Sequence, residues 1–143
     1  MKIVNHHSIL TSAIVAFLCA CDGILGLDGE RQQLGVISFY NDPVVVEAPD
    51  TVTRGQPFIV IVRTYGGGCI SQGPTEVRVD DLRATVTPFD INSGGHVCTR
   101  ELRLFRHEAP IEFARSGTAT LVFRGVTRPD DEPIVVERTV IVR

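Results

Sequence analysis

The sequence predicts an all-β protein whose antiparallel strands form the two sheets of a β-sandwich. From about residue 35 onward, apolar and polar side chains alternate at every second position, and no long segment has the 3.6-residue period of a helix. Turn-forming residues interrupt this alternation at intervals of about eight to twelve residues. About eight short strands spaced in this way are typical of an antiparallel sandwich.

The first half of this region contains the most hydrophobic strand. Residues 36–40 alternate before the turn Asn41-Asp42-Pro43. The segment Phe58–Tyr65 is rich in β-branched and aromatic residues and has apolar side chains on both faces, which predicts a central strand. Three glycines, Gly66–Gly68, end this strand. Such a run is typical of a flexible loop.

The second half supplies strands whose buried faces follow from their alternation. Val77 and Val79 have the opposite parity to Ala84, so we expect a bulge or turn at Asp80-Asp81. The alternation is cleanest over Thr118–Gly125, before a polar turn and a last strand. The expected inward-facing positions of that clean segment are Ala119, Leu121 and Phe123.

The N-terminus has the composition of an export signal. Lys2 precedes a 12-residue uncharged run at residues 9–20. A membrane-spanning helix needs about 20 apolar residues, whereas the apolar core of a signal peptide is about as long as this run. The segment therefore predicts a signal peptide.

The run ends in Leu18-Cys19-Ala20-Cys21, which resembles the lipobox of bacterial lipoproteins. The resemblance implies that Cys21, preceded by the small Ala20, carries a covalent lipid and becomes the first residue of the mature protein. Cys19 is the rival acceptor, but it follows the bulky Leu18. A simple secretory signal and an uncleaved anchor remain as alternatives. The resemblance implies a lipoprotein signal peptide at residues 1–20 and a protein anchored on the periplasmic or cell-surface side of a bacterial envelope membrane. Residues 21–34 contain several glycines and no strand alternation, which predicts a tether.

Two further segments resemble bacterial immunoglobulin-like envelope domains. Ala48–Tyr65 is similar to their first two strands, with an edge strand, a glycine-centred turn and a hydrophobic central strand. Phe113–Phe123 is similar to the corner and the penultimate strand of the same domains. The resemblance implies an immunoglobulin-like β-sandwich over residues 35–143.

Cys69 and Cys98 remain in the mature chain once Cys21 is lipidated and Cys19 leaves with the signal peptide. Export places them in an oxidising compartment, where an even number of cysteines pairs, so we expect one disulfide. The alternative is a zinc site formed by Cys69, His96 and Cys98, although the paired ligands of most zinc sites are absent. No cofactor is expected other than the lipid on Cys21.

The features that could support catalysis are weak. Cys69 or Ser71 could act as a nucleophile with His96 as its base, but no Gly-x-Ser-x-Gly motif accompanies them. The carboxylate groups Asp80-Asp81 and Asp130-Asp131-Glu132 lie among turn residues, which favours solvated loops over a glycosidase site. The sequence therefore predicts that the protein is not an enzyme.

The charges are nearly balanced, with a formal net charge of −3, which argues against a nucleic-acid partner. Lys2 is the one lysine, so its removal with the signal excludes Schiff-base chemistry and a phosphate-binding lysine loop. Four arginines could bind an anionic ligand, but the glutamates between them favour a mixed solvated surface. These arginines are Arg100, Arg103, Arg106 and Arg115.

Together these features predict a non-enzymatic lipoprotein that binds or braces another component of the cell envelope, either a protein or a glycan. A second hypothesis is a carrier of a small ligand or a metal, which would use the loops Gly66–Cys69 and Gly94–Cys98. A third is a hydrolase, for which the sequence offers no positive feature. A free-thiol titration separates the first two, because a carrier with thiolate ligands keeps reactive thiols.

Overall fold

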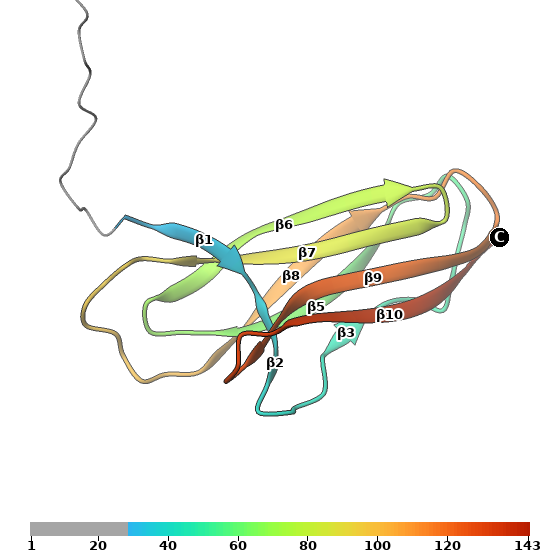
Figure 1. The fold of residues 1–143 in the computed structure, drawn as a ribbon. Helices are drawn as coiled ribbons and strands as arrows, with labels where there is room; N and C mark the ends of the chain where they lie inside the picture. The colour runs from blue at the N-terminus through green and yellow to red at the C-terminus, as the bar shows by residue number, and fades with distance from the viewer. Residues whose placement is uncertain (1–28) are drawn as a thin grey trace, which may run out of the picture.

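A computed structural model describes residues 29–143, and these residues contain ten strands and no helix (Figure 1). The predicted signal peptide at 1–20 and the predicted lipid acceptor Cys21 lie outside the described residues. The all-β prediction is confirmed. The strands are β1 (Arg31–Leu34), β2 (Val36–Phe39), β3 (Val46–Glu47), β4 (Thr51–Val52), β5 (Phe58–Gly66), β6 (Ile70–Asp80), β7 (Arg83–Asn92), β8 (Arg103–Ile111), β9 (Gly117–Arg128) and β10 (Pro133–Val142).

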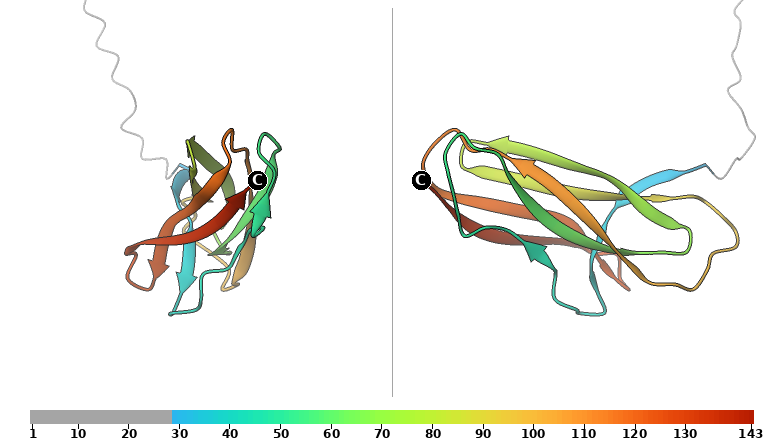
Figure 2. Two further views of the ribbon diagram at one scale, coloured as in Figure 1. Left: turned by 90° about the vertical axis from the view of Figure 1, so that its right-hand side faces the viewer. Right: turned by 180° about the vertical axis from the view of Figure 1, so that it is seen from behind.

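Two sheets pack face to face (Figure 2). The larger sheet, here called sheet A, has the order β1-β7-β9-β10-β4, with β2 also paired to β9 and β6 to β7. The smaller one, sheet B, has the order β3-β5-β8. The predicted antiparallel arrangement holds for sheet B, whereas sheet A is mixed, because β7–β9, β2–β9 and β4–β10 are parallel pairs. In the case of β7 and β9, β8 carries the chain back through sheet B, so both strands start at the same end.

The core lies between the sheets where the alternation predicted it. Ala119, Leu121 and Phe123 of β9 are fully buried, as expected. Val60 and Val62 of the central strand β5 are also fully buried and face them from sheet B. β6 and β7 form a hairpin in which Asp80 pairs with Arg83, so the predicted turn at Asp80-Asp81 is confirmed.

The ordered fold begins earlier than predicted. Residues Arg31–Leu34 were expected in the tether, but they form β1 and pair with the end of β7. Most β1 side chains are exposed, so the strand is held by its backbone and carries little hydrophobic alternation. Gly35 then joins the sheet at the point where β7 and β9 diverge: its N–H donates to Pro88 O and its carbonyl accepts from Val126 N.

The two ends of the molecule differ in the connections that they carry. The β5–β6 turn, the β7–β8 loop and the start of β1 lie at one end, here called the disulfide end (Figure 1). The β6–β7 turn and Arg143 lie at the opposite end, here called the C-terminal end. In two views of the ribbon the β7–β8 loop projects beyond the other connections of the disulfide end (Figure 2).

Candidate functional site

The disulfide end is held by the bond between Cys69 and Cys98, whose Cα atoms are 5.1 Å apart. This confirms the predicted pairing. The bond ties the β5–β6 turn to the β7–β8 loop. The backbone of the loop bends around it, because the carbonyl oxygens of Gly95 and Val97 both lie 3.6 Å from Cys69 Sγ.

The three glycines at 66–68, expected as a flexible loop, instead allow two backbones to approach closely. Gly67 and Gly68 have φ values of 118° and 62°, which side chains disfavour. A Cβ on Gly67 would lie 2.4 Å from Glu101 O, and a Cβ on Gly68 would lie 2.6 Å from Thr99 O. The glycines therefore let the β5–β6 turn pack directly against the β7–β8 loop.

The disulfide prevents Cys69 and Cys98 from binding zinc as thiolates. Both sulfur atoms are bonded to each other, so neither Cys69 nor Cys98 is a thiolate ligand beside His96. No three ligand-type side chains within residues 29–143 gather as a metal site would require. Cys69 is likewise not a free nucleophile, and Ser71 lies exposed on β6, opposite Ile91.

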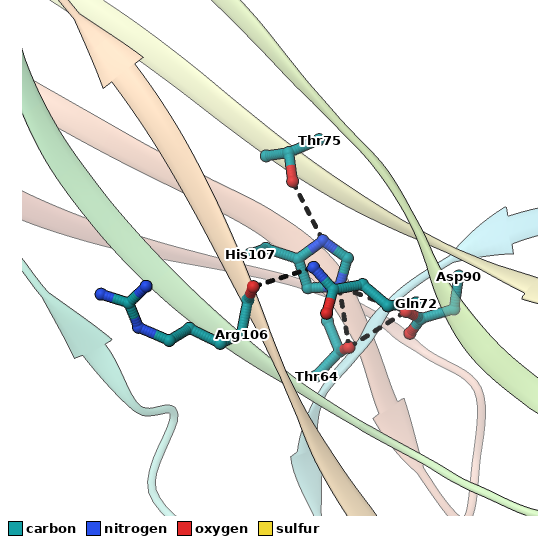
Figure 3. Close-up of polar contacts among 6 residues, drawn as sticks. All are labelled: Thr64, Gln72, Thr75, Asp90, Arg106 and His107. Carbon is teal, nitrogen blue, oxygen red and sulfur yellow. Dashed lines mark hydrogen bonds and ion pairs between the residues drawn. The ribbon is translucent and has the colours of Figure 1, made fainter.

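A polar cluster that sequence reasoning missed lies buried between the sheets (Figure 3). Asp90 of β7 and Thr75 of β6 belong to sheet A, and Thr64 of β5 and His107 of β8 belong to sheet B. His107 Nε2 is 3.2 Å from Asp90 Oδ1 and 3.1 Å from Thr64 Oγ1. The Thr64 hydroxyl donates to Asp90 Oδ1 at 3.1 Å, and Thr75 Oγ1 lies 3.0 Å from His107 Nδ1.

This arrangement places a carboxylate and a hydroxyl on opposite nitrogens of one imidazole, which is the order of an acyl-transfer triad. His107 and Asp90 are only 0% and 1% exposed, so their side chains offer almost no surface to a substrate. Thr64 also shares the carboxylate oxygen with the imidazole. The cluster therefore forms a buried hydrogen-bond network that joins the two sheets.

The alternation of the strands could have found this cluster. Asp90 continues the inward positions Ala84 and Val86 of β7, and all three are buried. His107 continues the inward positions Ala109 and Ile111 of β8 in the same way. A polar or charged residue at an inward-facing strand position needs a hydrogen-bonding partner, which the facing sheet can supply.

The outer face of sheet A carries a groove of about 520 Å³. Thr85 and Thr87 of β7 point into it, opposite Arg78 and Glu76 of β6 in the strand register. Arg124 of β9 lines the other side. Within the described residues, the side chains of Arg78 and Arg124 make no hydrogen bond or ion pair. The remaining lining residues are Val77 and Phe89.

The four arginines that the sequence grouped together do not form one patch. Arg115 lies at the C-terminal end and pairs with Asp81, 34 positions away in the sequence. Arg103 pairs with Glu101, and Arg106 pairs with Glu108. The structure therefore favours the mixed charged surface over an anion site there. Asp130-Asp131-Glu132 forms the exposed β9–β10 turn, where Asp131 pairs with Arg128 at 2.5 Å.

The pKa of Tyr65 is raised from its ordinary value of 10.0. Burial raises the pKa of Tyr65 most, and the charge of Asp42 raises it further. Hydrogen bonding to the Asp42 side chain is the smallest of the three causes that raise the pKa of Tyr65. Its ring stacks on Phe39, with centroids 5.4 Å apart, so the loop after β2 is held against the outer face of sheet B.

No protein-family model, curated protein or solved structure matches this chain. Over residues 29–143, no helix has the length and apolar character needed to cross a membrane.

Proposed function

We propose that this chain is the precursor of a bacterial lipoprotein, whose mature form is a non-enzymatic binding module of the cell envelope. A lipid on Cys21 anchors it on the periplasmic or cell-surface side of a membrane. The two-layered all-β fold and the Cys69–Cys98 disulfide support an exported immunoglobulin-like domain, because disulfides persist in oxidising compartments.

The observation that carries the binding role is the groove on the outer face of sheet A. Two guanidinium groups, from Arg78 and Arg124, lie there without an ion-pair partner in the described residues. Guanidinium groups pair with carboxylates through two parallel hydrogen bonds. The hydroxyls of Thr85 and Thr87 add hydrogen-bonding groups to the same wall. The groove therefore suits an envelope protein or glycan that presents carboxylates.

The proposal that the protein is not an enzyme is supported by the burial of the polar cluster. A catalytic imidazole must reach its substrate, whereas His107 is fully buried and its nitrogens already contact Thr64, Thr75 and Asp90. These contacts give the cluster a structural role in joining the two sheets. The groove lies on the opposite face of sheet A from this cluster, since Thr87 and Asp90 have opposite parity on β7.

The anchor is tested with two matched variants of the full-length protein in bacterial cells. Cys21→Ser should lose the lipid and appear in the soluble fraction, because two or three acyl chains are needed for lasting membrane binding. Cys19→Ser is the control and should stay in the membrane. Membrane retention of Cys21→Ser with normal processing would overturn the lipid assignment.

The groove is tested with a photo-crosslinking side chain at Thr87 in the membrane-bound protein. Arg124→Ala should reduce the crosslinked product severalfold. Arg83→Ala is the matched control, because Arg83 is exposed on the same sheet but already pairs with Glu137 at 2.7 Å. Equal crosslinking by both variants would show that the arginines of the groove do not bind the partner.

A further inference from the structure

We propose that the disulfide end rests on the lipid bilayer, and that the β7–β8 loop at residues 93–102 contacts lipid directly. The proposal rests on the lipid at Cys21 that is part of the proposed function. It adds an orientation and a second membrane contact, which the lipid alone does not provide.

The length of the chain between the lipid and β1 limits how far the fold can lie from the membrane. Ten residues, 21–30, precede β1, and a fully extended chain of that length spans at most about 35 Å. Arg31, the first residue of β1, pairs with Asn92, which is the last residue before the loop. β1 therefore starts beside this loop and far from the C-terminal end (Figure 1).

The loop presents apolar side chains to solvent at that position. Val97 is 93% exposed, the highest fraction among the large exposed hydrophobic residues of the described chain. Leu102 in the same loop is 59% exposed, and Leu104 at the start of β8 is 49% exposed. Burying such side chains in the apolar edge of a bilayer removes them from water.

The loop is also held in one shape, which lowers the ordering cost of binding. The disulfide fixes Cys98 next to Val97, and the carbonyl oxygen of Val97 lies against Cys69 Sγ. On the other side, Gly67 and Gly68 have no side chains, so the β5–β6 turn packs closely against the backbone of Glu101 and Thr99. Val97 is thus exposed on a loop whose backbone is held on both sides.

The charges of the loop fit an anionic membrane surface. Arg100 is exposed, and its side chain makes no ion pair or hydrogen bond within residues 29–143. Glu101, the carboxylate next to Arg100 in the sequence, pairs with Arg103 at 2.9 Å and not with Arg100. A single arginine near anionic lipids contributes about 1 kcal/mol of attraction.

This orientation leaves the proposed binding surface open. The groove is lined by Glu76–Arg78 of β6 and by Thr85 and Thr87 of β7, away from Asn92 at the disulfide end, so a bilayer under that end does not cover it. The C-terminal end, with Arg143 and the β6–β7 turn, then points away from the membrane.

The test uses tryptophan fluorescence, because the chain contains no tryptophan. Val97→Trp and Gln56→Trp are made in the full-length lipidated protein and reconstituted into vesicles of phosphatidylethanolamine and phosphatidylglycerol. Part of the lipid carries brominated acyl chains, which quench indole on contact. Gln56 is exposed in the turn before β5 at the C-terminal end and is the matched control.

Severalfold stronger quenching at Val97→Trp than at Gln56→Trp supports the proposal, as does a blue-shifted emission at Val97→Trp alone. Equal weak quenching at both positions, in protein whose lipid is confirmed by mass, overturns the proposal and leaves the anchor intact. Protein that carries no lipid at Cys21 overturns both the proposal and the proposed function.

Discussion

His107 Nε2 on β8 lies 3.2 Å from Asp90 Oδ1 on β7, so one hydrogen-bonded pair joins the two sheets of the molecule. Both side chains are buried, and Thr64 contacts both of them. Asp90 Oδ2 accepts no hydrogen bond from the described residues. The pair is therefore the centre of a polar cluster in a largely apolar interior.

Removing the imidazole should destabilise the protein strongly. His107→Leu leaves the Asp90 carboxylate buried with Thr64 as its remaining donor, and breaking a buried pair costs about 3–5 kcal/mol. Asp90→Ala combined with His107→Leu should cost less than the two single changes added together, by at least about 1 kcal/mol. Urea unfolding of the four proteins measures this coupling, and strictly additive values would show that the two residues act independently.

Gly35 should tolerate no side chain unless Thr64 makes room. A Cβ at Gly35 would lie 2.4 Å from Thr64 Cγ2, so Gly35→Ala overpacks the cluster at a cost of about 1–3 kcal/mol. Thr64→Ser removes that methyl group and keeps the hydroxyl. The combination Gly35→Ala with Thr64→Ser should recover most of the lost stability in thermal unfolding. A double variant as unstable as Gly35→Ala would place the clash elsewhere.

The disulfide should contribute a large share of the stability. The bond joins residues separated by 29 positions, for which the chain-entropy model gives about 3.6 kcal/mol. Replacing Cys69 and Cys98 together with alanine should lower the melting temperature by roughly 15 °C. Reduction of the wild-type protein should reproduce this shift and leave the double variant unchanged. A double variant that melts with the oxidised wild type would contradict the stabilising role.

The stability should fall in alkaline solution because of Tyr65. Its pKa is raised in the folded state by burial and by Asp42, so the unfolded chain loses the phenol proton first as the pH rises. The contribution is therefore complete below about pH 10 and is lost as the pH rises through the folded pKa. Tyr65→Phe should flatten the pH dependence of unfolding above about pH 10, whereas Tyr40→Phe is the control. An unchanged slope in Tyr65→Phe would assign the effect to other groups.

The sequence was sufficient for those parts of the fold that leave an alternating pattern. The buried positions of β9 and the turn at Asp80-Asp81 were predicted correctly, because one face of each strand packs on the core. β1 was missed because its pairing uses the backbone and its side chains are mostly exposed. The parallel pairs were missed because alternation reports which face is buried and carries no information about which strands are neighbours.

The candidate site was predicted in part for the same reason. Counting cysteines gave the Cys69–Cys98 bond, since two thiols have one possible pairing. The groove could not be predicted, because Arg78 and Arg124 are 46 positions apart and meet through the register of β6, β7 and β9. The close packing of Gly67 against Glu101 was equally hidden, since it depends on a contact between two loops.

The most direct measurement of the central proposal is the mass of the N-terminal peptide of the protein purified from bacterial membranes. A lipid-anchored binding module requires a peptide that begins at Cys21 and carries the mass of a diacylglyceryl group on its thiol. An N-terminal peptide without lipid, or one that begins elsewhere than Cys21, would contradict the anchor and the membrane-facing orientation of the disulfide end.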